Sequence, residues 1–208
     1  ALVAATMAQR PPSLRRTFGW QRLEVLAAAL NALLLIGVGV YVAVEAVRRT
    51  YSLPERFLLY VGSDRPHKNV TTLLHALALM DPTASMPLAL AGFDSDDSPL
   101  RREADDLELG QRVLWLGRIP EVDLPALYSA AHAFLFPSLV EGFGFPVLEA
   151  MACGTPVICS ALGLHKEITG GAAKLVHPTD RQEWRRAIHA AIVSLDWHDV
   201  YRDKGLAR

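Results

Sequence analysis

The segment PSLVEGFGFPVLEAMACGTPVICS, residues 137–160, places a glycine-spaced turn directly before a helix. Gly142 and Gly144 can adopt positive φ and let a ligand approach the backbone. Pro146 suits the first helical turn, where its missing N–H group costs nothing. The free N–H groups of that turn would face the loop, and such helix starts bind anions such as a diphosphate. The segment therefore predicts an anion-binding turn, with a plain tight turn as the alternative.

Two carboxylates bracket this turn, Glu141 and Glu149, eight positions apart. Glu149 would lie one helical turn into the helix, where a carboxylate can accept two hydrogen bonds from a vicinal diol such as that of a ribose. The helix around Glu149 is largely apolar, which argues against a purely solvated side chain. Loop and helix together could therefore hold a phosphate and a sugar.

Short apolar runs alternate with helical patterns on both sides of this segment. The expected strands are residues 57–61, 88–91, 113–116, 133–136, 156–159 and 172–176. The expected helices are residues 69–80, 124–131, 146–153 and 179–195, the last opened by a capping box of Thr179 and Gln182. Uninterrupted apolar strands between helices indicate a parallel sheet covered on both faces, whose ligands bind at the carboxyl ends of the strands. We expect this α/β domain to span residues 55–208.

The N-terminal segment, residues 1–50, differs in composition from the rest of the chain. Its stretch VLAAALNALLLIGVGVYVAV, residues 25–44, holds twenty residues without a charge. A helix of that length spans roughly 30 Å, the thickness of the hydrocarbon core of a bilayer. We expect a single membrane helix over about residues 20–49, with residues 55–208 in the cytoplasm; a buried core helix is the alternative.

Charge and composition narrow the functional classes. The 208 residues contain 21 Lys and Arg and 22 Asp and Glu, a net charge of −1, which excludes a general nucleic-acid binder. Residues 1–50 carry a net charge of +4 and residues 51–208 a net charge of −5, which indicates two parts in different surroundings. Two cysteines exclude a disulfide scaffold and a four-cysteine zinc site.

Residues 55–208 resemble the C-terminal, donor-binding half of GT-B glycosyltransferases of the family 4 type. Residues 137–157 match the Glu-x7-Glu region of that family almost position for position. The segments YVGSDRPHKNVTTLLHAL (60–77), VLWLGRIPEVDLPALYSAA (113–131) and GGAAKLVHPTD (170–180) match in order and spacing. The resemblance implies a Rossmann-like parallel sheet with helices on both faces, which is one half of the GT-B fold.

The resemblance also implies roles for particular residues. Glu149 would bind the ribose hydroxyls of a nucleoside-diphosphate sugar, and Glu141 would be the catalytic residue in contact with the transferred sugar. The remaining donor-binding positions it implies are the backbone of Gly142, Phe143 and Gly144, the amides of Val147 and Leu148, and the side chain of Lys68. A solvated loop lysine is the alternative for Lys68.

Departures from the family pattern fall in the loop after the first strand. An Arg commonly follows the first glycine, but this chain has Ser63 there, and Arg65 is expected to compensate. His67 also stands where Arg is common and could still donate a hydrogen bond. Ser138, at the start of the central segment, is expected to shape its loop, because no His–Asp pair marks it as a nucleophile.

The implied reaction is transfer of a sugar from a nucleotide sugar with retention of configuration, assisted by the leaving diphosphate. No metal and no other cofactor is expected. The acidic run at residues 94–97 could hold Mg²⁺ or Mn²⁺, but we favour an acidic solvated loop. The seven histidines show no spacing typical of metal ligands.

Residues 17–49 resemble a transmembrane helix of the cation diffusion facilitator transporters. The shared features are the FGW start at 18–20, the RLE run at 22–24, Asn31 and the EA pair at 45–46. One helix cannot form a transport pathway, so transport is not expected.

A GT-B enzyme has two Rossmann-like domains, and this sequence has no counterpart of the acceptor-binding one. We therefore expect a fragment or a join of two reading frames, with little or no transferase activity by itself. The alternatives are a non-catalytic nucleotide-sugar-binding module, working with a partner that carries the acceptor domain, and a chimeric fragment joined to a transporter helix.

Overall fold

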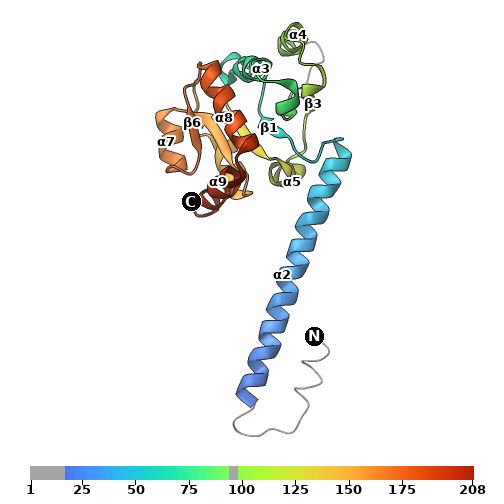
Figure 1. Cartoon of the computed structure of the whole chain (residues 1–208). Coiled ribbons are helices and arrows are strands. Elements are labelled where there is room, and N and C mark those ends of the chain that lie inside the picture. Colours follow the sequence, from blue (N-terminus) through green and yellow to red (C-terminus); the bar gives the residue numbers. More distant parts are fainter. Residues whose placement is uncertain (1–16, 94–97) are drawn as a thin grey trace. The chain divides into compact units, whose positions relative to one another are not determined.

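The computed structural model describes residues 17–93 and 98–208, and Figure 1 shows the whole chain. The acidic run considered as a metal site, residues 94–97, lies outside the described residues. The chain divides into two compact units, one ending at Glu45 and one running from Ala46 to Arg208.

The first unit is dominated by helix α2, Thr17–Thr50, which continues for one turn into the second unit. Its stretch from Val25 to Thr50 has a mean hydropathy of 2.3 and is long and apolar enough to cross a membrane. The large apolar side chains from Val25 to Val42 are exposed. The expected long hydrophobic helix is therefore confirmed, and within the described residues its apolar stretch is not buried.

The second unit is built on a six-stranded sheet in the order β3-β2-β1-β4-β5-β6. All neighbouring strands are parallel, and Leu58 at the start of β1 lies level with Leu88 on one side and Ala133 on the other. The strands are β1 Leu58–Val61, β2 Leu88–Ala91, β3 Val113–Gly117, β4 Ala133–Phe136, β5 Val157–Ser160 and β6 Lys174–Val176. The parallel α/β sheet expected from the sequence is confirmed.

Seven helices accompany this sheet within residues 46–93 and 98–208, apart from the end of α2. They are α3 Val70–Ala78, α4 Pro99–Asp106, α5 Leu124–Ala130, α6 Phe145–Ala152, α7 Gly163–Thr169, α8 Arg181–Val193 and α9 Leu195–Leu206. Helix α3 packs against α8, and α5 packs against α6. Because crossover connections between parallel strands are right-handed, the helices that follow β1 and β4 lie on opposite faces.

Apolar strands and helix stripes form the core of this unit. Tyr60, Phe134 and Phe136 are fully buried on β1 and β4, and Trp184 of α8 is buried as expected. The start of α8 differs from the prediction. Helix α8 begins at Arg181, and the carboxylate of Asp180 accepts a hydrogen bond from the Glu183 N–H group at 2.9 Å. Asp180 therefore caps this helix in place of Thr179.

The strand order places β1 and β4 side by side at the centre of the sheet. The chain leaves β1 toward one edge of the sheet and leaves β4 toward the other. Such a topological switch point leaves a crevice outside the carboxyl ends of the two central strands, where open α/β sheets bind ligands. The loops after β1 and β4 therefore border the crevice in which a ligand site is expected.

Candidate functional site

Backbone and amide hydrogen bonds tie the loops after β1 and β4 together. The Leu139 N–H group donates to the His67 carbonyl at 2.8 Å. The Asn69 amide donates to the Pro137 carbonyl at 3.0 Å and to the Pro178 carbonyl at 2.8 Å. Asn69 itself has φ of 56°, in the left-handed region, and ends the short 3-10 turn η1, Pro66–Lys68. These bonds fix the direction in which Lys68 leaves its loop.

The side chains of Lys68 and Glu141 form an ion pair at this switch point. Lys68 Nζ lies 2.6 Å from Glu141 Oε1, and the two side chains are only 18% and 10% exposed. The Lys68 ammonium also lies 5.3 Å from the centroid of the Phe136 ring, at the end of β4. The alternative of a solvated loop lysine is therefore wrong, because Lys68 is paired and mostly shielded.

The glycine turn follows Glu141 and leads into α6. Gly144 has φ of 82° and is the N-cap of α6, and its carbonyl accepts a hydrogen bond from the Val147 N–H group at 3.0 Å. A Cβ atom on Gly144 would lie 3.0 Å from Ile168 Cδ1, whereas Gly142 has open space around it. The turn is thus closely packed against α7 at Gly144 and has free space around Gly142. The role expected for the Val147 amide stays a prediction, and this amide already has one acceptor.

Two exposed aromatic rings border the turn. Phe143 and Phe145 are 49% and 62% exposed, and their ring centroids lie 4.6 Å apart. Only the backbone of Phe143 was expected to contact the donor. The turn therefore combines an ion pair on one side with an apolar surface on the other.

Glu149 lies on α6 and faces α5 rather than the ion pair. Its Oε2 atom accepts a hydrogen bond from the Tyr128 hydroxyl at 3.1 Å. Burial raises the pKa of the Tyr128 hydroxyl, and the negative charge of Glu149 adds to the shift. Glu149 is exposed, because the buried residues Val147, Ala150 and Met151 occupy the inward face of the same helix. The argument that apolar neighbours shield Glu149 is therefore wrong, while its carboxylate remains available to solvent.

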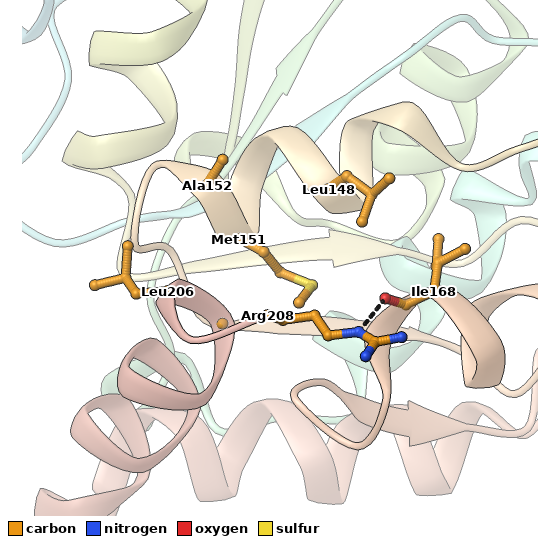
Figure 2. Close-up of a pocket in the computed structure, with 7 residues that line it drawn as sticks. Leu148, Met151, Ala152, Ile168, Leu206 and Arg208 are labelled. Atoms are coloured by element: carbon orange, nitrogen blue, oxygen red, sulfur yellow. Dashed lines mark hydrogen bonds between the residues drawn. The ribbon is translucent and has the colours of Figure 1, made fainter.

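Arg65 and Leu148 each line a cavity. Arg65 is exposed and lines a cavity of about 260 Å³ together with Asp64 and Glu103. Leu148 lines a larger cavity of about 590 Å³, between α6, the end of α7 and the last residues of the chain. Figure 2 shows this second cavity, with Arg208 donating a hydrogen bond to the Ile168 carbonyl at 3.3 Å. The compensation expected of Arg65 stays a prediction.

Two residues of this region were not identified from the sequence. Tyr128 is the hydrogen-bond partner of Glu149, and nothing in its spacing marked it. His165, on α7, is completely buried, and its ring lies 5.6 Å from that of Phe136. No sequence motif includes His165, because the folding of the chain brings it close to Phe136 and the glycine turn. Among the residues that the structure describes, no three His, Cys, Asp or Glu side chains are grouped to hold a metal ion.

Comparison with known proteins identifies the family. Residues 45–194 match the family described as Glycosyl transferases group 1. The chain belongs to the group 1 glycosyl transferases. It is similar to O-antigen chain mannosyltransferase B of Escherichia coli, with 36% identity over 157 residues, which cover 73% of this chain and 41% of that protein. This group 1 glycosyl transferase chain thus spans about two fifths of the length of that curated relative.

Solved structures of group 1 glycosyl transferases and related enzymes share the fold. Sucrose-phosphate synthase from Thermosynechococcus elongatus superposes with a TM-score of 0.68 and 32% identity, over 77% of this chain and 42% of that one. Anabaena Alr3699/HepE, solved in complex with UDP-glucose, gives a TM-score of 0.70 and 24% identity, over 79% of this chain and 47% of that one. The Rossmann-like parallel sheet expected from the resemblance to one half of the GT-B fold is therefore confirmed.

Proposed function

We propose that this group 1 glycosyl transferase unit binds a nucleoside-diphosphate sugar at the carboxyl ends of β1 and β4 and serves in transfer of the sugar with retention. The observation that carries the proposal is the Lys68–Glu141 ion pair beside the Gly142–Gly144 turn. A cation, a carboxylate and a helix start are thereby gathered at one switch point. Such a set suits a ligand with a diphosphate at one end and hydroxyl groups at the other.

The proposed roles follow from charge. Lys68 contacts the diphosphate and stabilises the negative charge that develops on it as the sugar departs. Glu141, the proposed catalytic residue, accepts hydrogen bonds from the hydroxyl groups of the transferred sugar, together with the backbone of the glycine turn. The Glu149 carboxylate accepts hydrogen bonds from both ribose hydroxyls, and the Tyr128 hydroxyl orients this carboxylate. These roles require no metal ion, in keeping with a family 4 type enzyme.

The donor and the acceptor are proposed from the named relative. The Escherichia coli relative is a mannosyltransferase, so mannose is the first sugar to test for this chain. We propose that turnover also requires an acceptor-binding domain supplied by a partner. Transfer to an acceptor by the purified chain without any partner would contradict this part of the proposal.

A location at a membrane is proposed from helix α2. Its large exposed apolar side chains between Val25 and Val42 would be costly in water and suit a bilayer core. The ligand-binding unit would then face the cytoplasm, where nucleotide sugars are made. The likeness of residues 17–49 to a transporter helix stays a prediction.

The test is calorimetric titration of the full chain in a mild non-ionic detergent. UDP-glucose, GDP-mannose and ADP-glucose are compared with UDP, GDP and ADP. We expect one nucleotide series to bind, and the Lys68→Ala and Glu149→Ala variants to bind it at least tenfold more weakly, the loss of about 1.4 kcal/mol of binding free energy. Glu121→Ala, an exposed carboxylate on the turn before α5, is the matched control and should bind as the wild type does. A folded chain that binds none of the six compounds would overturn the proposal.

A further inference from the structure

Three buried polar side-chain atoms at the carboxyl ends of β4 and β5 have no hydrogen-bond partner among the described residues. They are Ser138 Oγ, Ser160 Oγ and His165 Nε2, and all three residues are completely buried. A buried polar atom without a partner costs about 1–3 kcal/mol, so proteins seldom keep one without a reason. These three atoms lie at the same edge of the sheet as the ion pair.

The chemical state of His165 follows from its contacts. Its Nδ1 atom lies 2.8 Å from the Ser160 carbonyl oxygen, which can only accept a hydrogen bond, so Nδ1 carries the proton. The neutral ring then presents Nε2 as an acceptor. The Thr169 hydroxyl donates to the His165 carbonyl at 2.7 Å and holds the backbone of this turn of α7. The Nδ1 atom of the ring is therefore hydrogen-bonded, whereas Nε2 has no hydrogen-bond partner among the described residues.

The unsatisfied edge of the ring lies against the glycine turn. A Cβ atom on Gly144 would lie 3.5 Å from His165 Cδ2 and 3.6 Å from His165 Nε2. The His165 ring also lies 5.6 Å from the ring of Phe136, centroid to centroid, and the Lys68 ammonium lies over that Phe136 ring. His165 thus contacts the anchored end of the turn and the aromatic support of the ion pair.

We propose that His165 is a positioning residue of the donor site, whose Nε2 accepts a hydrogen bond from a backbone N–H group of residues 142–145 when the turn holds the transferred sugar. The first N–H groups of a helix have no partner within the helix, so donors are available on this side. The open space around Gly142 allows the turn to adjust, while His165 and Ile168 hold Gly144 in place. This inference rests on the proposed function, because it concerns the same nucleotide-sugar site.

Substitution of His165 by asparagine or by glutamine tests the roles of its two ring nitrogens independently. An asparagine places its amide near Nδ1 and can keep the bond to the Ser160 carbonyl, whereas a glutamine places its amide near Nε2. We expect His165→Asn to bind the nucleotide sugar about tenfold more weakly, the effect of losing one hydrogen bond. Its affinity for the free nucleoside diphosphate should stay within about twofold of the wild-type value, and His165→Gln should bind the nucleotide sugar within about threefold of it.

The outcomes distinguish this inference from the proposed function. If the wild type binds no nucleotide sugar, both fail. If the wild type binds one, and His165→Asn binds as tightly or loses the free diphosphate to the same extent, the positioning role is wrong and the proposed function stands.

A measurement on the wild type covers the case in which a variant does not fold. In protein labelled with ¹⁵N-histidine, the Nε2 resonance of His165 should move toward that of a hydrogen-bonded nitrogen when the nucleotide sugar is added, but not when the free diphosphate is added. An unchanged resonance with bound nucleotide sugar would overturn the proposal.

Discussion

The side chains of Lys68 and Glu141 meet across the switch point of the sheet, with Nζ and Oε1 2.6 Å apart, although 73 positions separate the two residues in the chain. Each charge is mostly shielded from water. Removing one partner leaves the other poorly solvated, which costs more than the pair itself contributes. The pair therefore links the stability of the sheet to the chemistry of the site.

Lys68→Met and Glu141→Gln should each lower the free energy of unfolding by about 2 kcal/mol, because each leaves a shielded charge without its partner. The double variant should lose less than the sum of the two. Urea unfolding of the four proteins, followed by circular dichroism, gives the coupling energy. Strictly additive losses would show that the ion pair contributes nothing to the fold.

Tyr128→Phe should weaken nucleotide-sugar binding about threefold to tenfold, because the hydroxyl that orients Glu149 is lost, at a cost of about 1 kcal/mol. The ring should keep its edge-to-face contact with Phe134, in which the centroids lie 5.3 Å apart. Calorimetry measures the affinity, and thermal unfolding shows whether the packing survives. An unchanged affinity would mean that Glu149 is oriented without Tyr128 or does not bind the ribose.

Gly144→Ala and Gly142→Ala form a matched pair. Gly144 has positive φ and a tight contact with Ile168, so alanine there should cost about 1–2 kcal/mol or more of unfolding free energy. Gly142 has open space, so alanine there should cost well under about 1 kcal/mol. Denaturant unfolding measures the loss of unfolding free energy in each variant. Equal losses would contradict the close packing of Gly144 against α7.

Stability should fall as the pH drops from 7 to 5, partly through His132. Burial lowers the pKa of His132 below its ordinary value of 6.5, and the nearby charges of Arg56 and His198 also disfavour its protonation. The unfolded chain therefore takes up a proton at higher pH than the folded chain does. This contribution is present above about pH 6.5 and is lost as the pH falls.

The His132→Gln variant isolates that contribution. Glutamine does not titrate and can still donate to the Ala191 carbonyl, which lies 2.8 Å from His132 Nε2. The loss of stability between pH 7 and pH 5 should therefore be smaller in this variant than in the wild type. An identical pH profile for the two proteins would exclude His132 as a contributor.

Membrane attachment through α2 predicts that the full chain stays with the membrane fraction during an alkaline carbonate wash. Placing Lys at Leu34, in the middle of the apolar stretch, should weaken attachment, because a charge at the bilayer centre costs about 2.5–3.5 kcal/mol. Leu206→Lys, an exposed position on α9, is the control. Release of the wild type by the wash would contradict attachment through this helix.

Strands were predicted to within about two residues, because a buried parallel strand is an uninterrupted apolar run that ends at a turn residue. The bounds of helix α4 were not predicted, since its sequence PLRREADD is mostly charged and buries only Leu100 and Ala104. Helix α7 was missed because it is seven residues long and begins at a glycine. Short helices depend on tertiary packing, which a periodicity argument does not contain.

The site was partly predictable for the same reason. Lys68 and Glu141 follow strands whose carboxyl ends share one edge of the sheet, so their meeting could be expected. His165 could not be found in this way, because its contact with Gly144 joins two helices 21 positions apart and involves no motif. The exposure of Glu149 depends on which side of α6 packs against the sheet. The apolar composition of the helix does not specify that side, so the prediction of a shielded Glu149 was wrong.

The strand order has a consequence for synthesis. The central strand β1 leaves the ribosome first, and each later strand pairs with one already made: β2 with β1, β3 with β2, β4 with β1, β5 with β4 and β6 with β5. The sheet can therefore grow outward one strand at a time during translation, with no gap waiting to be filled. Strands β2 and β3 are added on one side of β1, and strands β4 to β6 are added on the other side. Pairing of β4 with β1 brings Glu141, in the loop after β4, next to Lys68. The nascent chain can thus form the Lys68–Glu141 ion pair only when the second half of the sheet begins.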